Sequence, residues 1–286
     1  MWLLVVSLVQ VAAPPPPAMR MTGVLQRPGL REISGVAVSR AHRGVLWTHN
    51  DSGDGPFIYA TDTTGKYLGA WRVRGANATD WEDIALGPCP AGTETCLYIA
   101  DTGDNGEVRS SVDVYAVAEP APGVGPADSI RTTAPATALH LTYPGGPADV
   151  EAMYVTRDGT LYLVTKGRSR GVRLLRVRRD AWAAAGSVAA ELVQQLPIQP
   201  DRLIGRLVTG AAVSPDGSPV VVRTYTELYI FTPAANGALG PSPVVCALGP
   251  IEPQGEGVGF LDSTTLVLTS EAPRGVTGTI HITRCP

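Results

Sequence analysis

A segment of similar plan recurs five times along the 286-residue chain, and this repeat constrains the fold more than any other feature of the sequence. In each copy an apolar run follows a short polar entry, and the copies begin at Glu32, Asp80, Asp149, Leu207 and Gln254. A second and a third apolar run follow in every copy, and a weaker fourth run follows in four of them. Short apolar runs grouped in this way, at intervals of roughly 50 to 70 residues, are typical of the four-stranded blades of a β-propeller.

The fifth copy has no fourth apolar run before Pro286. Residues 21–26, near the other end of the chain, could supply the missing strand, so that strands from both termini close the ring. The prediction is therefore an all-β fold: a single β-propeller over residues 19–286, with five blades of four antiparallel strands. Six blades, or an irregular number, is the alternative.

Two segments depart from the strand pattern. Residues 180–193 contain a run of alanines behind Asp180, a residue type that often caps helices, so we expect a short helical insert before the fourth strand of blade 3. Residues 119–136 are rich in Pro, Ala, Gly and Thr, a composition that predicts a surface loop rather than a linker between domains.

The N-terminal residues are apolar up to Ala13 and are followed by four prolines. About 20 apolar residues are needed to span a bilayer, so this run is too short, but it resembles the hydrophobic region of a secretory signal. We expect residues 1–18 to be a signal peptide or a short hydrophobic segment, and the protein to be secreted or extracytoplasmic. An uncleaved anchor and a buried strand are the alternatives.

The four cysteines fit an oxidising compartment. A disulfide between Cys89 and Cys96 would close a hairpin-like loop between two apolar runs. If Cys246 and Cys285 also pair, they attach the C-terminus to the rest of the fold. Their spacings do not resemble those of a zinc site.

The charge is nearly balanced, with 23 basic and 26 acidic residues and a formal net charge of −3. Such a chain has no long-range positive field, and this argues against nucleic acid as a partner. No other stretch is apolar for long enough to cross a membrane. We expect a monomer whose partner is a small anionic molecule or another extracellular ligand.

Aligning the five copies also predicts where polar side chains gather. One column, at the entry to the first strand of each copy, contains Ser34, Glu82, Glu151, Thr209 and Glu256. The second strands end in polar clusters that include His49, Asp101, Asp104, Lys166, Arg168, Arg223, Tyr225 and Glu271. Because the first and second strands of a blade are antiparallel, both sets are expected on one rim of the channel.

A ring of carboxylates at that rim has two interpretations. Carboxylates within about 6 Å of one another repel unless protons or a cation lie between them, and calcium takes six to eight oxygen ligands. We therefore predict a calcium site whose candidate ligands are Glu82, Asp101, Asp104, Glu151, Glu256 and Glu271. The alternative is structural: the Asp-rich loops are turns, and the glutamates pair with arginines between blades.

The sequence resembles secreted bacterial β-propellers of the phytase-like or esterase-like group, and it is also similar to lactonase-like propellers. The resemblance rests on the mixed acidic and basic clusters after the second strands and on the acidic starts of three first strands, Trp81-Glu-Asp-Ile, Asp149-Val-Glu-Ala and Gln254-Gly-Glu-Gly. The resemblance runs from about residue 21 to the end of the chain and implies calcium ions held by a ring of carboxylates. It also implies phosphate binding by basic residues, here Lys166, Arg168 and Arg223. Those phytases have six blades and more basic residues at the channel mouth, and this departure argues against phytate itself.

Two classes of function follow. The first is a calcium-dependent hydrolase of a small anionic ester such as a phosphoester, in which the cation polarises the substrate and activates water. Its candidate catalytic residues are Glu151, Glu256 and His49, and its candidate substrate-binding residues are Lys166, Arg168, Arg223 and Tyr225. A lactonase with one calcium ion is a second enzymatic possibility. The other class is a non-catalytic propeller that binds a protein, a glycan or another ligand at the same rim; His49 is then a hydrogen-bonded structural residue.

Overall fold

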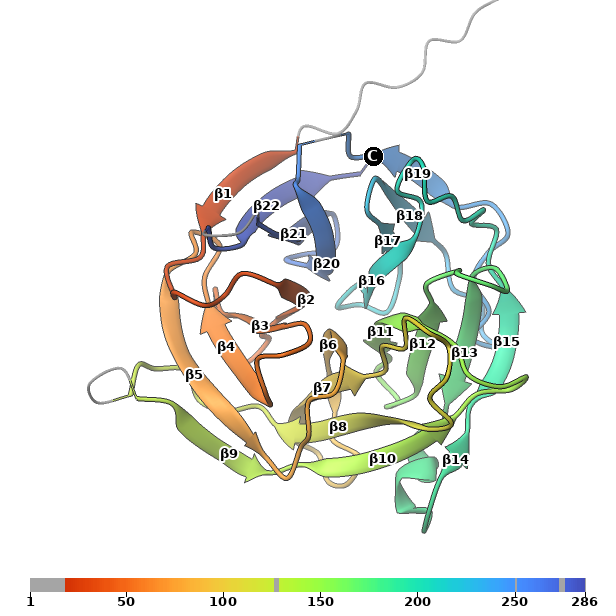
Figure 1. Ribbon diagram of the computed structural model, residues 1–286, viewed down its shortest axis with the longest axis horizontal. Coiled ribbons are helices and arrows are strands. Elements are labelled where there is room, and N and C mark those ends of the chain that lie inside the picture. The colour runs from red at the N-terminus through yellow and green to blue at the C-terminus, as the bar shows by residue number, and fades with distance from the viewer. Residues whose placement is uncertain (1–18, 126–128, 250, 273–275, 286) are drawn as a thin grey trace, which may run out of the picture.

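The computed structural model describes residues 19–125, 129–249, 251–272 and 276–285. In these residues five sheets surround a central channel, as Figure 1 shows, which confirms the prediction of an all-β propeller with five blades. The predicted signal peptide, residues 1–18, lies outside the described residues. No helix in the described ranges is long and apolar enough to cross a membrane.

Each blade is an antiparallel sheet that runs outward from the channel. Blade 1 contains β2 (Ile33–Val38), β3 (Leu46–Asn50), β4 (Phe57–Thr61) and β5 (Tyr67–Arg74). Blade 2 contains β6 (Trp81–Pro88), β7 (Thr95–Asp101), β8 (Val112–Ala118) and β10 (Thr137–Thr142). Blade 3 contains β11 (Val150–Val155), β12 (Leu161–Thr165), β13 (Arg173–Val177) and β15 (Glu191–Gln195), and blade 4 contains β16 (Val208–Val213), β17 (Val220–Thr224), β18 (Glu227–Phe231) and β19 (Val244–Ala247).

Blade 5 closes the ring with strands from both ends of the chain, as predicted. It contains β20 (Gln254–Phe260), β21 (Thr265–Glu271), β22 (Thr279–Arg284) and, outermost, β1 (Arg20–Val24). The strand β1 pairs antiparallel with β22, so that Arg20 lies opposite Ile282. A disulfide between Cys246 and Cys285 joins the C-terminal end to blade 4, which adds a covalent tie to the closure.

Two blades receive a fifth, parallel strand from the next blade along the chain. The strand β9 (Arg131–Pro135) leaves blade 2 and pairs with β5, and β14 (Val188–Ala189) leaves blade 3 and pairs with β10. The prediction of a loop over residues 119–136 was therefore wrong for β9. Its sequence lacks an apolar pattern, because the pairing is supplied by the free backbone edge of β5.

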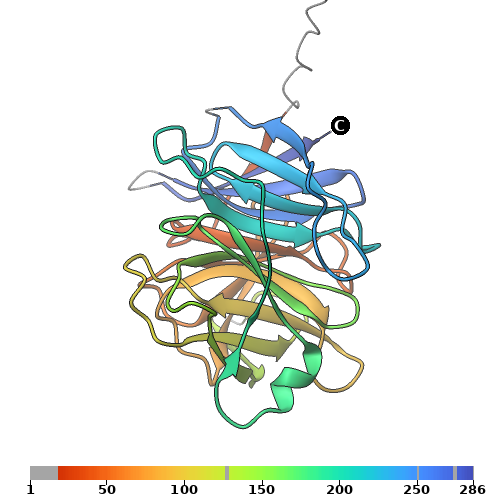
Figure 2. The same ribbon diagram turned by 90° about the vertical axis from the view of Figure 1, so that its right-hand side faces the viewer.

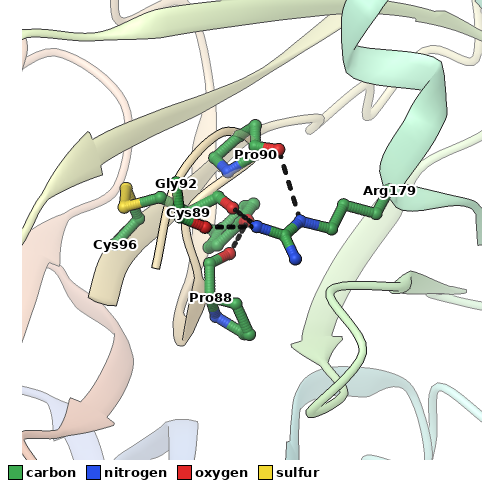
Figure 3. Close-up of a disulfide and its surroundings, with 7 residues drawn as sticks. Pro88, Cys89, Pro90, Gly92, Cys96 and Arg179 are labelled. Atoms are coloured by element: carbon green, nitrogen blue, oxygen red, sulfur yellow. Dashed lines mark hydrogen bonds between the residues drawn. A yellow bond between two sulfur atoms is a disulfide. The ribbon is translucent and has the colours of Figure 1, made fainter. Parts of the chain in front are cut away.

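The predicted helical insert of blade 3 is present only as η2 (Arg179–Ala183), a five-residue 3-10 helix. Figure 2 shows η2 at the outer edge of the ring. The disulfide between Cys89 and Cys96 closes the β6–β7 hairpin, as predicted. The guanidinium of Arg179 donates to the carbonyl oxygens of Cys89 at 2.6 Å and Gly92 at 2.8 Å, and Figure 3 shows these bonds. The insert of blade 3 is thus attached to blade 2.

The hydrophobic core lies between the blades. Each of the five hydrophobic clusters in the described residues combines side chains from two neighbouring blades. The aromatic residues Trp47, Tyr98 and Tyr162 lie at matching places in three second strands, and each belongs to one of these clusters. Burial between blades stabilises the ring as a unit, since no blade can hide its apolar faces alone.

Candidate functional site

Every inner strand has a break in its register at the polar column found in the sequence. We call the end of the channel where β2, β6, β11, β16 and β20 begin the upper rim, and the other end the lower rim. The pairing skips residues between Ile33 and Val36, Trp81 and Asp83, Val150 and Ala152, Val208 and Gly210, and Gly255 and Val258. The skipped positions include Ser34, Glu82, Glu151, Thr209 and Glu256. A β-bulge redirects the side chain of the extra residue, so the aligned column is the set of bulge residues.

The antiparallel pairing of first and second strands places Lys166 beside Glu151, as the alignment predicted. Val150 at the start of β11 lies opposite Thr165 at the end of β12, and the Lys166 amide donates to the carbonyl of Asp149 at 2.9 Å. The Lys166 Nζ lies 2.6 Å from Glu151 Oε1, and both side chains are buried. A buried lysine needs such a partner, because an isolated ammonium is costly to bury.

Five carboxylates converge at the upper rim in two groups that share Glu82. One group is Asp51, Asp80 and Glu82, and the other is Glu82, Asp149 and Glu151. Within each group, one oxygen of every carboxylate lies within 4.8 Å of the others. Oxygen atoms at this spacing could coordinate a single hard cation such as calcium.

Burial and mutual repulsion raise the pKa values of the central glutamates. Burial raises the pKa of Glu151 to about 7, although Lys166 opposes the shift. Burial, followed by repulsion from Glu151, raises the pKa values of Glu82 and Glu256 well above their usual range. At neutral pH the cluster therefore holds protons unless a cation takes their place.

Carboxylates of blades 1 and 5 next to the cluster also have raised pKa values. Burial, then repulsion from Asp51, raises the pKa of Glu271 to about 7. Burial raises the pKa of Asp51 to about 6, and repulsion from Asp80 adds to the shift. The predicted ligands Glu256 and Glu271 are thus repelled by carboxylates of the cluster, although neither belongs to the two groups of closely spaced oxygens.

The loop after β7 leaves room for the cluster because residue 103 is a glycine. A Cβ atom at Gly103 would lie 2.1 Å from Glu82 Oε1 and 2.5 Å from Asp80 Oδ2. Any larger side chain would displace two of the candidate ligands. The space around Glu82 therefore depends on the lack of a side chain at this position.

Asp101 and Asp104 have structural partners instead. The carboxylate of Asp101 accepts bonds from the amides of Thr79 and Asp80, both at 3.1 Å, and pairs with Arg109 at 3.1 Å. Asp104 accepts the amide of Arg109 at 2.7 Å. These two predicted ligands position the rim loops, and we leave them out of the proposed ion-binding set.

The basic residues expected to bind substrate are mostly engaged within the protein. The guanidinium of Arg168 bonds to Asp149 and Asn105 at the rim. Arg223 has no exposed surface: it donates to the carbonyls of Gly257 at 2.7 Å and Thr269 at 3.0 Å, and it pairs with Glu252. The expectation that Arg223 meets a substrate is corrected by this burial. Its bonds instead link blade 4 to blade 5.

Tyr225 remains at the rim beside Lys166, whose Nζ lies 5.9 Å from the centre of the Tyr225 ring. Burial raises the pKa of Tyr225 above its usual range, and repulsion from Glu256 contributes. Burial lowers the pKa of Lys166, but Glu151 and Tyr225 outweigh this and raise it above its usual range. Both groups therefore stay protonated near neutral pH.

His49 lies below the surface and favours the structural interpretation of that residue. Its Nδ1 lies 2.8 Å from the carbonyl oxygen of Asn50, and its ring packs edge-on against Trp81. The residue is fully buried, and this burial lowers its pKa to about 4. A neutral, enclosed imidazole of this kind does not reach the rim carboxylates as an acid or base.

Asp51, Asp80 and Asp149 were not predicted as ligands, although a signal for two of them was present. Asp80 and Asp149 stand two residues before the glutamates of the aligned column. Both precede the first residue of their inner strand, β6 and β11, so the alternation of side chains along a strand does not place them.

Asp83 was also not predicted, and its carboxyl group bridges three inner strands. Its side chain is fully buried, and one oxygen accepts the amides of Met153 at 2.8 Å and Ala211 at 3.3 Å. The other oxygen accepts the amide of Ile84 at 2.8 Å. One carboxyl group thus joins the inner strands of blades 2, 3 and 4 below the acidic cluster.

Comparisons with known proteins support the fold. No protein-family model matches the chain, and no curated protein matches its sequence significantly. Among solved structures, the PQQ-bound aldose sugar dehydrogenase from Streptomyces coelicolor aligns with a TM-score of 0.52 and 16% identity, over 96% of this chain and 99% of that chain. A putative oxidoreductase (glucose dehydrogenase) from Thermus thermophilus aligns with a TM-score of 0.50 and 13% identity, over 93% and 99%. At such low identity the likeness supports the propeller fold alone.

Proposed function

We propose that the upper rim binds a divalent cation, with calcium as the first candidate, and that the bound cation in turn binds a small anionic molecule. The observation that carries this proposal is the sharing of Glu82 by two groups of carboxylates with oxygens within 4.8 Å of one another. Calcium coordinates carboxylate oxygens in flexible geometry and tolerates shared ligands. It would replace the protons that the cluster otherwise needs.

The pattern of ion pairs favours one part of the cluster. Lys166 pairs with Glu151, and Arg168 pairs with Asp149. In the described residues no ion pair within 4.0 Å involves the other three carboxylates, which are Asp51, Asp80 and Glu82. We therefore assign the first cation to this group, with Glu151 and Asp149 as ligands of a second cation if one binds.

One observation favours a hydrolytic version of the proposal. Glu151 shares a group of closely spaced oxygens with Glu82, so it could accept a proton from a water bound to a cation held there. A cation held by Glu82 would lower the pKa of a coordinated water and polarise an ester or phosphoester. Lys166 and Tyr225 lie beside Glu151 and could orient the substrate, whereas buried Arg223 could not.

The dehydrogenase activity named for the two structural neighbours does not form part of our proposal. Pyrroloquinoline quinone carries three carboxylates, so a site for it needs cations that are free to pair with them. At this rim Lys166 and Arg168 already pair with Glu151 and Asp149, and Arg223 is buried. Without a bound cation the acidic cluster would repel such a cofactor, so the protein side chains alone do not fit it.

A calcium titration of the folded protein tests the proposal. A native-only site at a hundred times its dissociation constant adds about 2.7 kcal/mol, which raises the thermal midpoint by several degrees in a domain of this size. We expect this shift with calcium, its loss with chelator, and its absence in Glu82→Gln. The exposed Glu94→Gln is the matched control and should shift like the parent protein. Equal shifts in all variants, or none in the parent, would contradict the assignment.

A second measurement separates binding from hydrolysis. The calcium-loaded protein is assayed with 4-nitrophenyl phosphate and 4-nitrophenyl acetate, alongside Glu151→Gln. Turnover that disappears in this variant while calcium binding persists supports the hydrolase. If the loaded protein hydrolyses neither compound, the non-catalytic binding propeller is the better account of the same site.

We further infer that the protein functions outside the cytoplasm, as a monomer built from residues 19–286. Two disulfides support this inference, because disulfides persist mainly in oxidising compartments. The apolar N-terminal run is consistent with export. Detection of the protein in the medium, with a new N-terminus near residue 18, would test both the location and the boundary.

A further inference from the structure

The lower half of the channel contains a cavity of about 320 Å³ that the proposed function does not use. All five inner strands contribute to its wall. Its apolar lining includes Val38, Ile84, Leu86, Val155, Val213 and Phe260. None of the rim carboxylates is among its lining residues.

The cavity exists because the inner strands carry small residues at this level. Gly87, Ala211, Ala212 and Gly259 are among its lining residues. The cavity has the volume of about ten molecules of liquid water and lies at the lower end of the range for ligand pockets. Its exposed lining residues, such as Thr93 and Glu94, belong to the loop closed by the Cys89–Cys96 disulfide, so the cavity opens toward the lower rim.

Two arginines stand at the wall of this cavity, and within the described ranges neither has a carboxylate partner closer than 4.0 Å. The guanidinium of Arg40 donates to the carbonyl of Phe260 at 2.8 Å, and that of Arg157 donates to the carbonyl of Pro215 at 3.0 Å. Partial burial lowers the pKa of Arg40. A hydrogen bond from Ser214, and to a smaller extent attraction to Arg157, lowers the pKa of Asp216, so that aspartate offsets part of the Arg157 charge. Arg40 is therefore the less compensated cation of the two.

We propose that the lower cavity binds a small apolar carboxylate, with its hydrocarbon part among the inner strands and its carboxylate at Arg40. The apolar lining accounts for the hydrocarbon part, since burying it removes apolar surface from water. A guanidinium that donates to neutral carbonyls accounts for the carboxylate, because charge-assisted bonds to a carboxylate are stronger. Glu94 is the only carboxylate among the lining residues.

The test uses octanoate, 1-octanol and octylammonium as probes of equal chain length on the full folded protein. Isothermal titration calorimetry and ligand-observed NMR report their binding. We expect octanoate to bind at least tenfold more tightly than octanol, because charge-assisted hydrogen bonds are stronger than those between neutral groups. Octylammonium should bind most weakly. Equal affinity for octanoate and octanol would overturn the role of Arg40.

Variants separate the two parts of the proposal. Arg40→Gln should reduce octanoate binding about tenfold and leave octanol unchanged. Arg43→Gln is the matched control, because Arg43 is exposed on the same loop and does not line the cavity. Val213→Phe should abolish binding of both probes by filling the cavity, and Ala212→Leu serves if that variant unfolds. Binding that survives the filling variants, or no saturable binding at all, would mean that the cavity holds only water.

Discussion

The two ends of the central channel are built from the same five strands, yet the upper end is acidic and the lower end is apolar. At the upper end, bulges in the inner strands direct Glu82, Glu151 and Glu256 toward one another. At the lower end the pairing is regular, and apolar side chains surround a cavity. In this channel the carboxylates gather where the pairing of the inner strands is interrupted by bulges, and the regularly paired part is apolar.

Asp83 joins three inner strands between the two ends, and its removal should have the largest effect. In Asp83→Ala the buried amides of Met153 and Ala211 lose their acceptor, which should cost about 4 kcal/mol of unfolding free energy. Asp83→Asn keeps one acceptor oxygen but turns its NH2 group toward a backbone N–H, so it should cost less than Asp83→Ala and still be destabilising. Urea unfolding of both variants checks this. A similar cost for both substitutions would contradict the hydrogen-bonding role.

The pH dependence of stability should come from the upper end. In the folded state the pKa values of Glu151 and Glu271 are raised to about 7 and that of Asp51 to about 6. The folded protein therefore binds more protons than the unfolded chain above about pH 4.5, and stability must fall as pH rises toward 8. Without calcium we expect a loss of a few kcal/mol between pH 5 and pH 8, partly offset below about pH 6.5 because burial lowers the pKa of His49 to about 4.

Denaturant unfolding between pH 5 and pH 8 measures this loss. Glu151→Gln should flatten the profile, because one of the shifted groups is removed. Excess calcium should also flatten it, since the cation replaces protons at the cluster. A profile that is already flat in the parent protein without calcium would show that the carboxylates are ionised at little cost, against the proposed need for a cation.

Two glycines of β20 allow the same substitution at the two ends. A Cβ at Gly257, in the bulge, would lie 2.6 Å from the carbonyl oxygen of Ser34 and 2.8 Å from the amide nitrogen of Val36. These are backbone atoms that cannot move independently, so Gly257→Ala should cost about 2 kcal/mol. Its effect on calcium binding should be small, because the neighbouring Glu256 lies outside the two groups of closely spaced oxygens. Thermal unfolding and calcium titration are the measurements.

The lower glycine should tolerate the same change. A Cβ at Gly259 would lie 3.2 Å from both the Val36 carbonyl oxygen and Val38 Cγ2, and the neighbouring cavity allows small adjustments. We expect Gly259→Ala to change the unfolding free energy by less than about 1 kcal/mol and to leave calcium binding intact. If this variant is as damaging as Gly257→Ala, the two ends do not differ in packing as we infer.

The strands and the ring closure could be predicted because their signal is local and repeated. Apolar runs such as 97–100 and 161–164 recur at matching places, and only a propeller buries them all between blades. The strands β9 and β14 could not be predicted in this way. Their pairing depends on backbone edges of another blade, which leave no apolar pattern in Arg131–Pro135 or Val188–Ala189.

The candidate site was predicted in outline for the same reason. The alignment identified Glu82, Glu151 and Lys166 and placed them on one rim. It also placed His49 and Arg223 there, whereas both are buried inside the protein. The position of a residue at the end of a strand predicts the rim near which it lies. How deeply its side chain is buried depends on the neighbouring blade that covers it.

The number of blades, the four main strands of each blade and the rim at which carboxylates gather follow from a local pattern that the sequence repeats. Only the closed ring decides which carboxylates meet, that Asp83 joins three inner strands, and that an apolar cavity lies below. These features depend on contacts between blades that are far apart in the chain, as when Asp83 accepts the amide of Ala211. No local pattern specifies such contacts, since they arise only when the ring has closed.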